Sequence, residues 1–448
     1  MGTISSSGAL SISAGGNLTN AASVHAPAIS VPAPSMTAVR DVNLQAANIV
    51  NTGTISSTSG NVNLVTAGDQ VMNVNNTGGT VSAVNGAINV RDSGYSGLSN
   101  TNVVGGDLLS QQLNLNSGGG TINVNVGQLT GTVNSTGTAV HVKAATGDLK
   151  LGSQDLSGDP LFVNDSGDIH INSNVFVGED LTYVASGDII ASSAVTNISA
   201  VDVNGKGTNI TMIAGANVTG SDGVGASFTG ASATGGNVDF SAASSSLYIS
   251  SAATANLNAG GNQTYAAYSS QGSKGQILMP TGSTMNAQGN GSGASGNILV
   301  LGGSSSATAI TLGTITGQNV QIASSQPSIA GSGAVTYDGT GVLTSTNVLA
   351  RDNSIANGAV QVQQITGTSS VSIDGGNVST FGPILTTGSV AITARGNLTV
   401  GGSLVTNGGP LTLVAENSIV SSGSQAIYIS TSSNSGGGNI LIAAGAAS

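Results

Sequence analysis

The sequence predicts an all-β solenoid, a fold in which short strands and turns form coils that stack on one another. Three observations predict it: a repeat of about twenty residues, alternation of apolar and polar residues within each repeat, and few charged (6%) or aromatic (3%) side chains among 448 residues. A solenoid follows because a single repeat of this length cannot bury its apolar edge without a neighbour. Small aliphatic side chains suit the narrow interior of such a stack.

The repeat is marked by a glycine, then a polar or small residue, then an aliphatic residue. Between residues 86 and 189 the glycines stand 20 or 21 positions apart, at Gly86, Gly106, Gly127, Gly147, Gly167 and Gly187. The signal returns later at Gly275, Gly296, Gly376, Gly396 and Gly438. Coils of about 20 residues imply about twenty-two coils, and roughly 4.8 Å per coil gives a rod on the order of 100 Å long.

Within each repeat, apolar and polar residues alternate, as in 121–126 (TINVNV) and 168–172 (DIHIN). This is the pattern of a strand with one buried face, so Ile169 is expected to point inward and His170 outward. A β-sandwich is the second choice of architecture. It would need Asn-Gly or Asp-Gly hairpin turns in phase with the strands, and these do not recur in phase.

Residues 1–448 are expected to form one elongated solenoid, a piece of a longer protein because both ends continue the repeat. Three segments are expected to be loops or breaks. Segment 24–36 contains three prolines, which cannot pair within a central strand. Segments 215–236 and 282–296 are rich in Gly, Ser, Ala and Asn.

Charge and segment composition exclude several classes of protein. The formal charge is -11, and the eight Lys and Arg residues are scattered, so no nucleic-acid partner is expected. No apolar run is long enough to predict a membrane span, and no signal peptide opens the sequence. The absence of cysteine is compatible with an exported protein or with a cytosolic one.

The candidate catalytic and metal-binding residues stand in sequence contexts that are typical of turns and solvated surfaces, not of catalytic or metal sites. Asp165 and Asp168 could form a carboxylate pair, but their Asp-Ser-Gly-Asp context is typical of aspartates that cap the backbone. His25, His141 and His170 lack partners at metal-ligand spacing and are expected to be solvated. No enzyme activity, metal site or cofactor is therefore predicted. Thr-x-Thr tracks do not recur in phase, so an ice-binding face is not predicted either.

The repeat also stacks Asp148, Asp168 and Asp188 on successive coils. Carboxylates about 4.8 Å apart repel one another by roughly 3.5 kcal/mol at an effective dielectric of 20. Either bound calcium or hydrogen bonds from the backbone of each turn must relieve this repulsion. The second is favoured, because Lys150 and His170 lie close in sequence and would oppose a cation.

Segments 261–265 (GNQTY), 394–400 (ARGNLTV) and 415–419 (AENSI) resemble the degenerate repeats of filamentous-haemagglutinin-type exoproteins. These are the large secreted partners of bacterial two-partner secretion systems. The resemblance implies a right-handed parallel β-helix, displayed on or released from a Gram-negative cell after passing an outer-membrane transporter. The Asn-Pro-Asn motif of the family's secretion domain is absent from this sequence.

The function expected from the resemblance is that of an adhesin or its stalk, which attaches to glycans or proteins of host or neighbouring cells. Eight of the twelve aromatic residues lie between 162 and 268. Tyr265 and Tyr268 are therefore the candidate ligand contacts. Two alternatives remain: a polysaccharide-cleaving β-helix enzyme, and a fibre subunit that associates head to tail.

Overall fold

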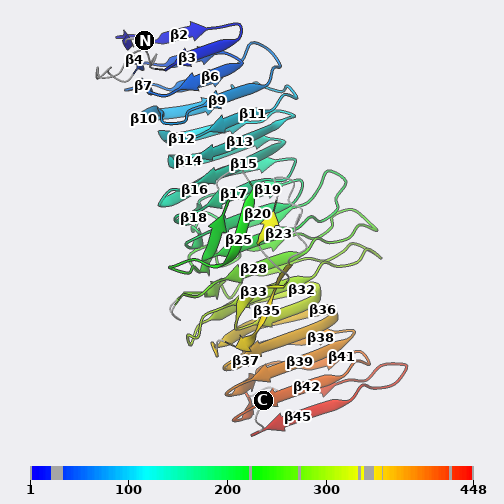
Figure 1. Ribbon diagram of the computed structural model, residues 1–448. Helices are drawn as coiled ribbons and strands as arrows, with labels where there is room; N and C mark the ends of the chain where they lie inside the picture. Colours follow the sequence, from blue (N-terminus) through cyan, green and yellow to red (C-terminus); the bar gives the residue numbers. More distant parts are fainter. Residues whose placement is uncertain are drawn as a thin grey trace.

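The computed structural model is an elongated stack of β-strands that follow one another from the N-terminal to the C-terminal end (Figure 1). The described residues are 3–21, 34–220, 225–270, 274–330, 334–337, 348–355, 357–422 and 426–445. Within these ranges the chain is all-β, and no helix is long and apolar enough to cross a membrane. Forty of the described strands form one sheet, and the pairings in it are parallel. The predicted all-β class with parallel stacking is confirmed.

The parallel strands form three faces, here called A, B and C. Six long strands turn the corners between faces: β10 (Thr80–Val90), β12 (Asp107–Asn116), β14 (Gln128–Gly137), β16 (Asp148–Leu156), β32 (Ile310–Ala323) and β36 (Val360–Gly375). Face A also contains β1 (Thr3–Ser6), β4 (Ser35–Ala38), β7 (Thr54–Ser57), β18 (Asp168–Ile171), β21 (Ile189–Ala191), β26 (Val238–Asp239), β29 (Ile277–Leu278), β37 (Val378–Thr380), β40 (Leu398–Val400) and β43 (Ile419–Ser421).

Faces B and C complete the stack. Face B contains the later parts of the long strands with β2 (Leu10–Ser13), β5 (Val42–Gln45), β8 (Val62–Val65), β19 (Val175–Val177), β22 (Asn197–Ala200), β27 (Tyr248–Ser250), β30 (Thr284–Asn286), β38 (Ile384–Thr386), β41 (Leu404–Thr406) and β44 (Ile429–Ser430). Face C contains the ends of β32 and β36 with β3 (Asn17–Asn20), β6 (Asn48–Asn51), β9 (Met72–Asn75), β11 (Thr101–Val104), β13 (Thr121–Val126), β15 (Ala139–Ala144), β17 (Leu161–Asn164), β20 (Leu181–Ala185), β23 (Ile210–Ala214), β28 (Gln263–Ala267), β31 (Ile298–Gly302), β39 (Ser389–Ala394), β42 (Leu411–Ala415) and β45 (Ile440–Ala444).

The pairing register repeats the spacing of the sequence in the regular parts of the stack. Asp148 pairs with Asp168, and Val378 pairs with Leu398. In the described part of the chain, face C contains sixteen paired strands, so at about 4.8 Å per step the stack is about 70 Å long. The predicted twenty-two coils and 100 Å are therefore too many and too long, because connecting loops consume residues without adding a strand to the stack.

The interior between the faces is apolar because inward and outward side chains alternate along each strand. In β18, Ile169 and Ile171 are fully buried, whereas His170 between them is half-buried on the outer side. This confirms the predicted register of that strand. The buried side chains form one continuous cluster that extends from Met36 to Ala415.

Three asparagines lie almost fully buried where face C ends and the chain turns. Asn20 Nδ2 donates to Asn51 Oδ1 at 2.7 Å, and Asn51 Nδ2 donates to Asn76 Oδ1 at 2.6 Å. Asn51 also accepts a hydrogen bond from the N–H of Gly53 and donates one to its carbonyl oxygen. These buried amides therefore have partners, which removes much of the free-energy cost of taking them out of water.

The outer side of the middle of face C, at β17, β20, β23 and β28, is covered by a small antiparallel sheet of β24 (Ala216–Thr219), β25 (Ala226–Ala231) and β34 (Val335–Tyr337). Outward side chains of face C, among them Val184 and Ile213, pack against Phe228 of this covering sheet. Strands buried on both sides have continuous apolar runs, which explains why alternation fades here. The prediction that 215–236 is a loop is therefore wrong in part, because the segment leaves the stack but forms two strands. Strands β33 (Ser325–Ala330) and β35 (Val348–Ile355) form a further antiparallel pair.

Of the other two predicted breaks, 24–36 is not borne out by its described residues, and 282–296 is correct only in part. Residues 24–33 of the segment 24–36 lie outside the described residues, and Ser35 and Met36 belong to β4. In the segment 282–296, β30 is a strand of face B, and residues 287–296 form no strand. The strand forms in spite of its glycine-rich surroundings because Met285 points inward and is fully buried.

Candidate functional site

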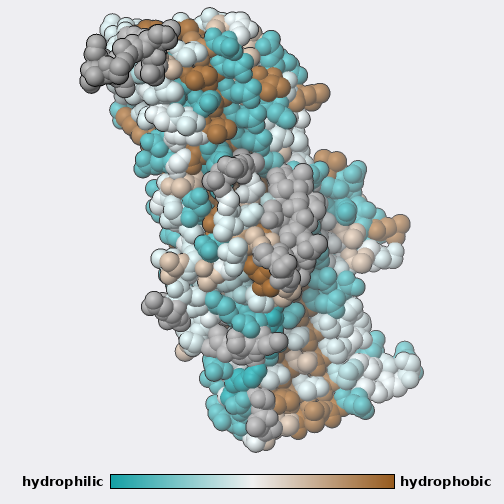
Figure 2. All heavy atoms as spheres, in the orientation of Figure 1, coloured by the Kyte–Doolittle hydropathy of each residue, from teal (hydrophilic) through white to brown (hydrophobic). Residues whose placement is uncertain are grey.

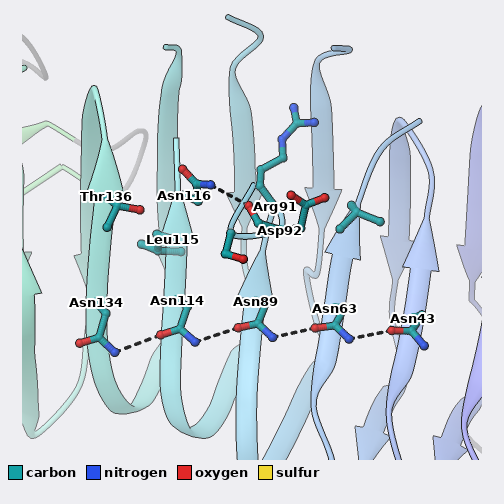
Figure 3. Close-up of a pocket in the computed structure, with 12 residues that line it drawn as sticks. Asn43, Asn63, Asn89, Arg91, Asp92, Asn114, Leu115, Asn116, Asn134 and Thr136 are labelled. Carbon is teal, nitrogen blue, oxygen red and sulfur yellow. Dashed lines mark hydrogen bonds between the residues drawn. The ribbon is translucent and has the colours of Figure 1, made fainter. Parts of the chain in front are cut away.

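Face B carries a row of five asparagines, one on each of five neighbouring strands. They are Asn43, Asn63, Asn89, Asn114 and Asn134, and the parallel pairing places each beside the next. Each amide nitrogen donates to the carbonyl oxygen of the asparagine before it, at N···O distances of 2.6, 2.7, 2.8 and 3.0 Å in chain order. Figure 3 shows this continuous row, here called the amide ladder.

The amide ladder has hydrogen-bonding capacity to spare. A side-chain amide has two N–H donors and two acceptor lone pairs, and each ladder bond uses one donor and one acceptor. Asn63, Asn89 and Asn114 therefore each retain a donor and an acceptor, repeated about every 4.8 Å along the rod. The ladder is uncharged, so it suits an extended ligand with many neutral polar groups.

Both ends of the ladder are capped by other groups. At the N-terminal end, Asn43 Nδ2 donates to Ser11 Oγ at 3.2 Å. At the other end, Asn134 Oδ1 accepts a hydrogen bond from the backbone N–H of Ser153 at 3.1 Å. A Cβ at Gly152 would lie 2.1 Å from Asn134 Oδ1, so a larger residue there would displace the end of the ladder.

Arg91 fixes the turn that forms one wall of the groove above the ladder. Its φ of 66° is uncommon for a residue with a side chain, and the side chain is only 3% exposed. Its Nε donates to Thr101 Oγ1 at 2.8 Å, and its terminal nitrogens donate to Thr66 Oγ1 and to the carbonyl oxygen of Gln70. The guanidinium carbon lies 4.3 Å from the ring centre of Tyr95, close enough for a cation–π interaction.

Asp69 holds the same turn from the other side. Its carboxylate accepts hydrogen bonds from the backbone N–H groups of Leu98 at 3.0 Å and Ser99 at 2.9 Å, and from the Tyr95 hydroxyl at 2.8 Å. These hydrogen bonds, with that from Leu98 the strongest influence, hold the pKa of Asp69 well below its usual range. The wall of the groove is therefore fastened at two points.

The amide ladder, this turn and Thr136 line a groove of about 620 Å³. A second groove of about 490 Å³ continues along face B and shares Thr136 with the first. Both volumes lie in the range of ligand sites, about 300–1,000 Å³. Together the grooves form a track along the rod in which polar side chains stand beside apolar surface.

The prediction that Tyr265 and Tyr268 contact a ligand is wrong, because both side chains are buried. Tyr265 points into the interior, where its hydroxyl donates to Gln263 Oε1 at 3.0 Å. Tyr268 lies beneath the covering sheet, with its ring centre 6.4 Å from that of Phe228. Burial raises the pKa of both hydroxyls. The aromatic residues between 162 and 268 mainly fill the interior and the space under the covering sheet.

Of the three histidines, His25 lies outside the described residues and His170 is half-buried. His141 was expected to be solvated, and that expectation is wrong. It is 6% exposed, with Nδ1 2.9 Å from Asn123 Oδ1 and Nε2 3.1 Å from the carbonyl oxygen of Asp159. His141 lies at the end of a second row of hydrogen-bonded amides, on face C. This row is formed by Asn17, Asn48, Asn73, Asn102 and Asn123.

The three stacked aspartates lie on successive coils at face A, as their spacing predicts: Asp148 and Asp168 begin β16 and β18, and Asp188 directly precedes β21. Asp148 pairs with Asp168, and Asp168 Oδ1 accepts a hydrogen bond from the backbone N–H of Asp188 at 2.7 Å. The Asp188 carboxylate in turn binds the ammonium group of Lys274 at 2.6 and 2.8 Å. The repulsion between these carboxylates is therefore relieved by the Asp188 N–H of the next coil and by the ammonium group of Lys274. The expectation that each aspartate accepts hydrogen bonds from its own turn is wrong for Asp168 and Asp188.

His170 lies between two of these carboxylates. Its Nε2 is 3.6 Å from Asp148 Oδ1 and 4.0 Å from Asp168 Oδ2, and one ligand atom from each of the three residues lies within 4.8 Å of the others. Sequence spacing did not predict this cluster. Asp165, the expected partner of Asp168, is not a member of it. The Asp148 side chain is 51% exposed. That this cluster binds no metal ion stays a prediction.

Sequence reasoning missed the amide ladder and Phe176, which lines the second groove. The signal was nevertheless present. Asn63, Asn89 and Asn114 each stand at an outward position between two inward aliphatic residues. Phe176 does the same in β19, with the pattern Val-Phe-Val and 46% exposure of the ring residue.

Comparisons with known proteins give no match to any family model, curated protein or solved structure.

Proposed function

We propose that the protein is a right-handed parallel β-helix with coils of about 20 residues that serves as an adhesive or stalk-forming protein of a Gram-negative cell surface. The register steps of 20 and 21 residues, as from Asp148 to Asp168 and from Asp107 to Gln128, support the coil length. The right-handed sense is what the resemblance implies, and the preference of parallel crossover connections, about 98% of which are right-handed, supports it.

The observation that carries the functional proposal is the continuity of the paired faces together with the ordered polar rows outside them. Each inner strand is hydrogen-bonded on both sides, and the amide ladder ties five strands through their side chains. Such a stack resists bending. Figure 2 shows hydrophilic side chains over much of one side of the rod, as suits a rigid element that holds a binding surface in water.

The partners follow from the same reasoning. Nineteen acidic residues against eight basic ones disfavour nucleic acid. The repeat-level resemblance to filamentous-haemagglutinin-type exoproteins supports secretion through an outer-membrane transporter and attachment to glycans or proteins of other cells. The open, preformed grooves of face B are available for such contacts.

The test is saturable binding of the purified, fluorescently labelled chain to epithelial cells and to bacterial cells. Competition by unlabelled chain is expected, with the heat-denatured chain as control. If neither cells, immobilised glycans nor matrix proteins bind the chain saturably, the adhesive role is wrong.

One observation favours the alternative of polysaccharide cleavage. The Asp148, Asp168 and His170 cluster brings two carboxylates and an imidazole together on face A. Paired carboxylates are the machinery of glycoside hydrolysis. Release of reducing ends from a polysaccharide that is abolished by Asp168→Asn would establish this activity, whereas we expect none.

The fibre alternative stays a prediction, in which unpaired strand edges of one copy pair with those of the next. Electron microscopy separates the alternatives, since discrete rods are expected of a stalk and long filaments of a self-assembling subunit.

A further inference from the structure

Phe176 is an aromatic ring exposed in the middle of face B. Its neighbours Val175 and Val177 point inward and are buried, so the strand geometry turns the ring outward, where it is 46% exposed. An outward ring in a β-strand gains little from packing, and it is available to a partner.

The pairing register places polar residues on both sides of this ring. Asp155 pairs with Phe176 from the strand before, and Ser199 pairs with it from the strand after. Thr136 pairs with Asp155 one step further away. The order along the rod is therefore hydroxyl, carboxylate, phenyl ring and hydroxyl, at steps of about 4.8 Å.

A short turn forms the wall beside this row. Val201 and Gly207 are bridged, and Asp202 Oδ1 accepts hydrogen bonds from the N–H groups of Asn204 and Lys206, both at 2.8 Å. The turn is thus ordered by its own carboxylate, so the groove of about 490 Å³ is preformed. A preformed groove avoids the cost of ordering a loop on binding.

We propose that this groove binds an uncharged glycan, with one sugar ring stacked on Phe176 and its hydroxyls hydrogen-bonded to Asp155 and Ser199. The apolar C–H face of a pyranose matches the face of an aromatic ring, and a carboxylate accepts hydrogen bonds from sugar hydroxyls. Among the twelve described residues that line the groove, Asp155 and Asp202 are charged and none is Lys or Arg. Acidic glycans are therefore repelled.

The bound chain runs along the rod. Thr136 belongs to both grooves, so an oligosaccharide that extends past Asp155 reaches the free donors and acceptors of the amide ladder. The uncharged ladder matches the hydroxyl groups of such a chain. The ligand class is thus a linear, neutral oligosaccharide longer than a single ring.

This inference rests on the proposed adhesive function and names its ligand class. The test is a glycan array probed with the full chain, followed by titration of neutral gluco- and galacto-oligosaccharides against heparin and sialylated oligosaccharides. Neutral oligosaccharides should bind, and acidic ones should not. The Phe176→Ala variant should weaken binding at least about tenfold, and Phe176→Tyr should retain it.

Phe381 supplies the matched control because it is also 46% exposed and does not line either groove. Phe381→Ala should bind as the unchanged chain does, with equal melting temperatures for both alanine variants. Retained binding in Phe176→Ala, or preference for acidic glycans, would overturn the site. Binding to cells without binding to any glycan would overturn the site and leave the adhesive function standing, whereas loss of all binding would overturn both.

Discussion

Tyr183 and Tyr265 point into the same interior row, with Met212 paired between them, but they differ in hydrogen bonding. The Tyr265 hydroxyl donates to Gln263 Oε1, whereas the fully buried Tyr183 hydroxyl has no hydrogen-bond partner in the described part of the chain. The Tyr183 ring instead packs against Phe162, with ring centres 5.7 Å apart. Tyr183 therefore stabilises the interior through the packing of its ring and not through its hydroxyl.

This difference predicts opposite effects of removing the two hydroxyls. An unpaired buried hydroxyl costs about 1–3 kcal/mol, so Tyr183→Phe should raise the free energy of unfolding by about 1 kcal/mol. Tyr265→Phe should lower it by about 1 kcal/mol, because Gln263 loses a donor. Urea unfolding followed by circular dichroism measures both. Equal destabilisation by the two changes would contradict the assigned hydrogen bonds.

The buried and the exposed asparagine rows should differ in their contribution to stability. Asn51→Ala removes the acceptor of the Asn20 amide and of the Gly53 N–H, and it removes the donor to Asn76 Oδ1. These three bonds are buried, so we expect a loss of about 3 kcal/mol. Asn89→Ala lies in the half-buried ladder, where water replaces the lost partner, and should cost about 1 kcal/mol or less. The same unfolding measurement applies. A larger loss for Asn89→Ala would mean that the outer ladder is the main stabilising row.

The wall of the ladder groove should loosen in acid. Because the pKa of Asp69 is lowered in the folded chain, its stabilising effect is complete above the unfolded pKa of about 3.9 and is lost as pH falls through the folded value. Hydrogen exchange of the Leu98 and Ser99 amides, corrected for intrinsic rates, should show protection that disappears at low pH. In Asp69→Ala the protection should already be absent at neutral pH. Full protection in that variant would show that Asp69 does not hold the turn.

The aspartate cluster on face A should be indifferent to metal ions. Asp168 already accepts the N–H of Asp188, and Asp188 already binds Lys274. Millimolar calcium or micromolar zinc should therefore leave the melting temperature nearly unchanged. A rise of several degrees that vanishes in Asp168→Asn would instead make Asp148, Asp168 and His170 a metal site.

The sequence predicts the stack well because its two signals are local. Alternation decides which side chain points inward, as Ile169 and His170 illustrate, and the period decides which residues pair, as with Asp148 and Asp168. The same alternation also places Phe176 outward, although its significance depends on Asp155 and Ser199, which only the register brings beside it.

The remaining features arise from contacts between distant segments. Tyr268 is buried because Phe228 and Tyr337 of the covering sheet lie over it, and the glycine-rich composition around β25 hides these strands from sequence reasoning. The groove wall depends on Arg91, whose φ of 66° and contacts with Thr66 and Thr101 have no local signal. Packing across the fold decided these positions, and composition alone could not reveal them.

The central claim is that the chain forms one parallel stack that advances by one strand spacing per coil. The protein has no cysteine, so spin labels can be attached at pairs of introduced cysteines. After allowance for the label arms, pulsed electron–electron double resonance should measure about 24 Å between the backbones at Asp155 and Thr316, which lie five strand steps apart on face B. Between Asp155 and Leu385, which lie seven steps apart, it should measure about 34 Å. Narrow distributions that increase in this order are expected. Equal distances, or broad distributions at both pairs, would contradict the stack.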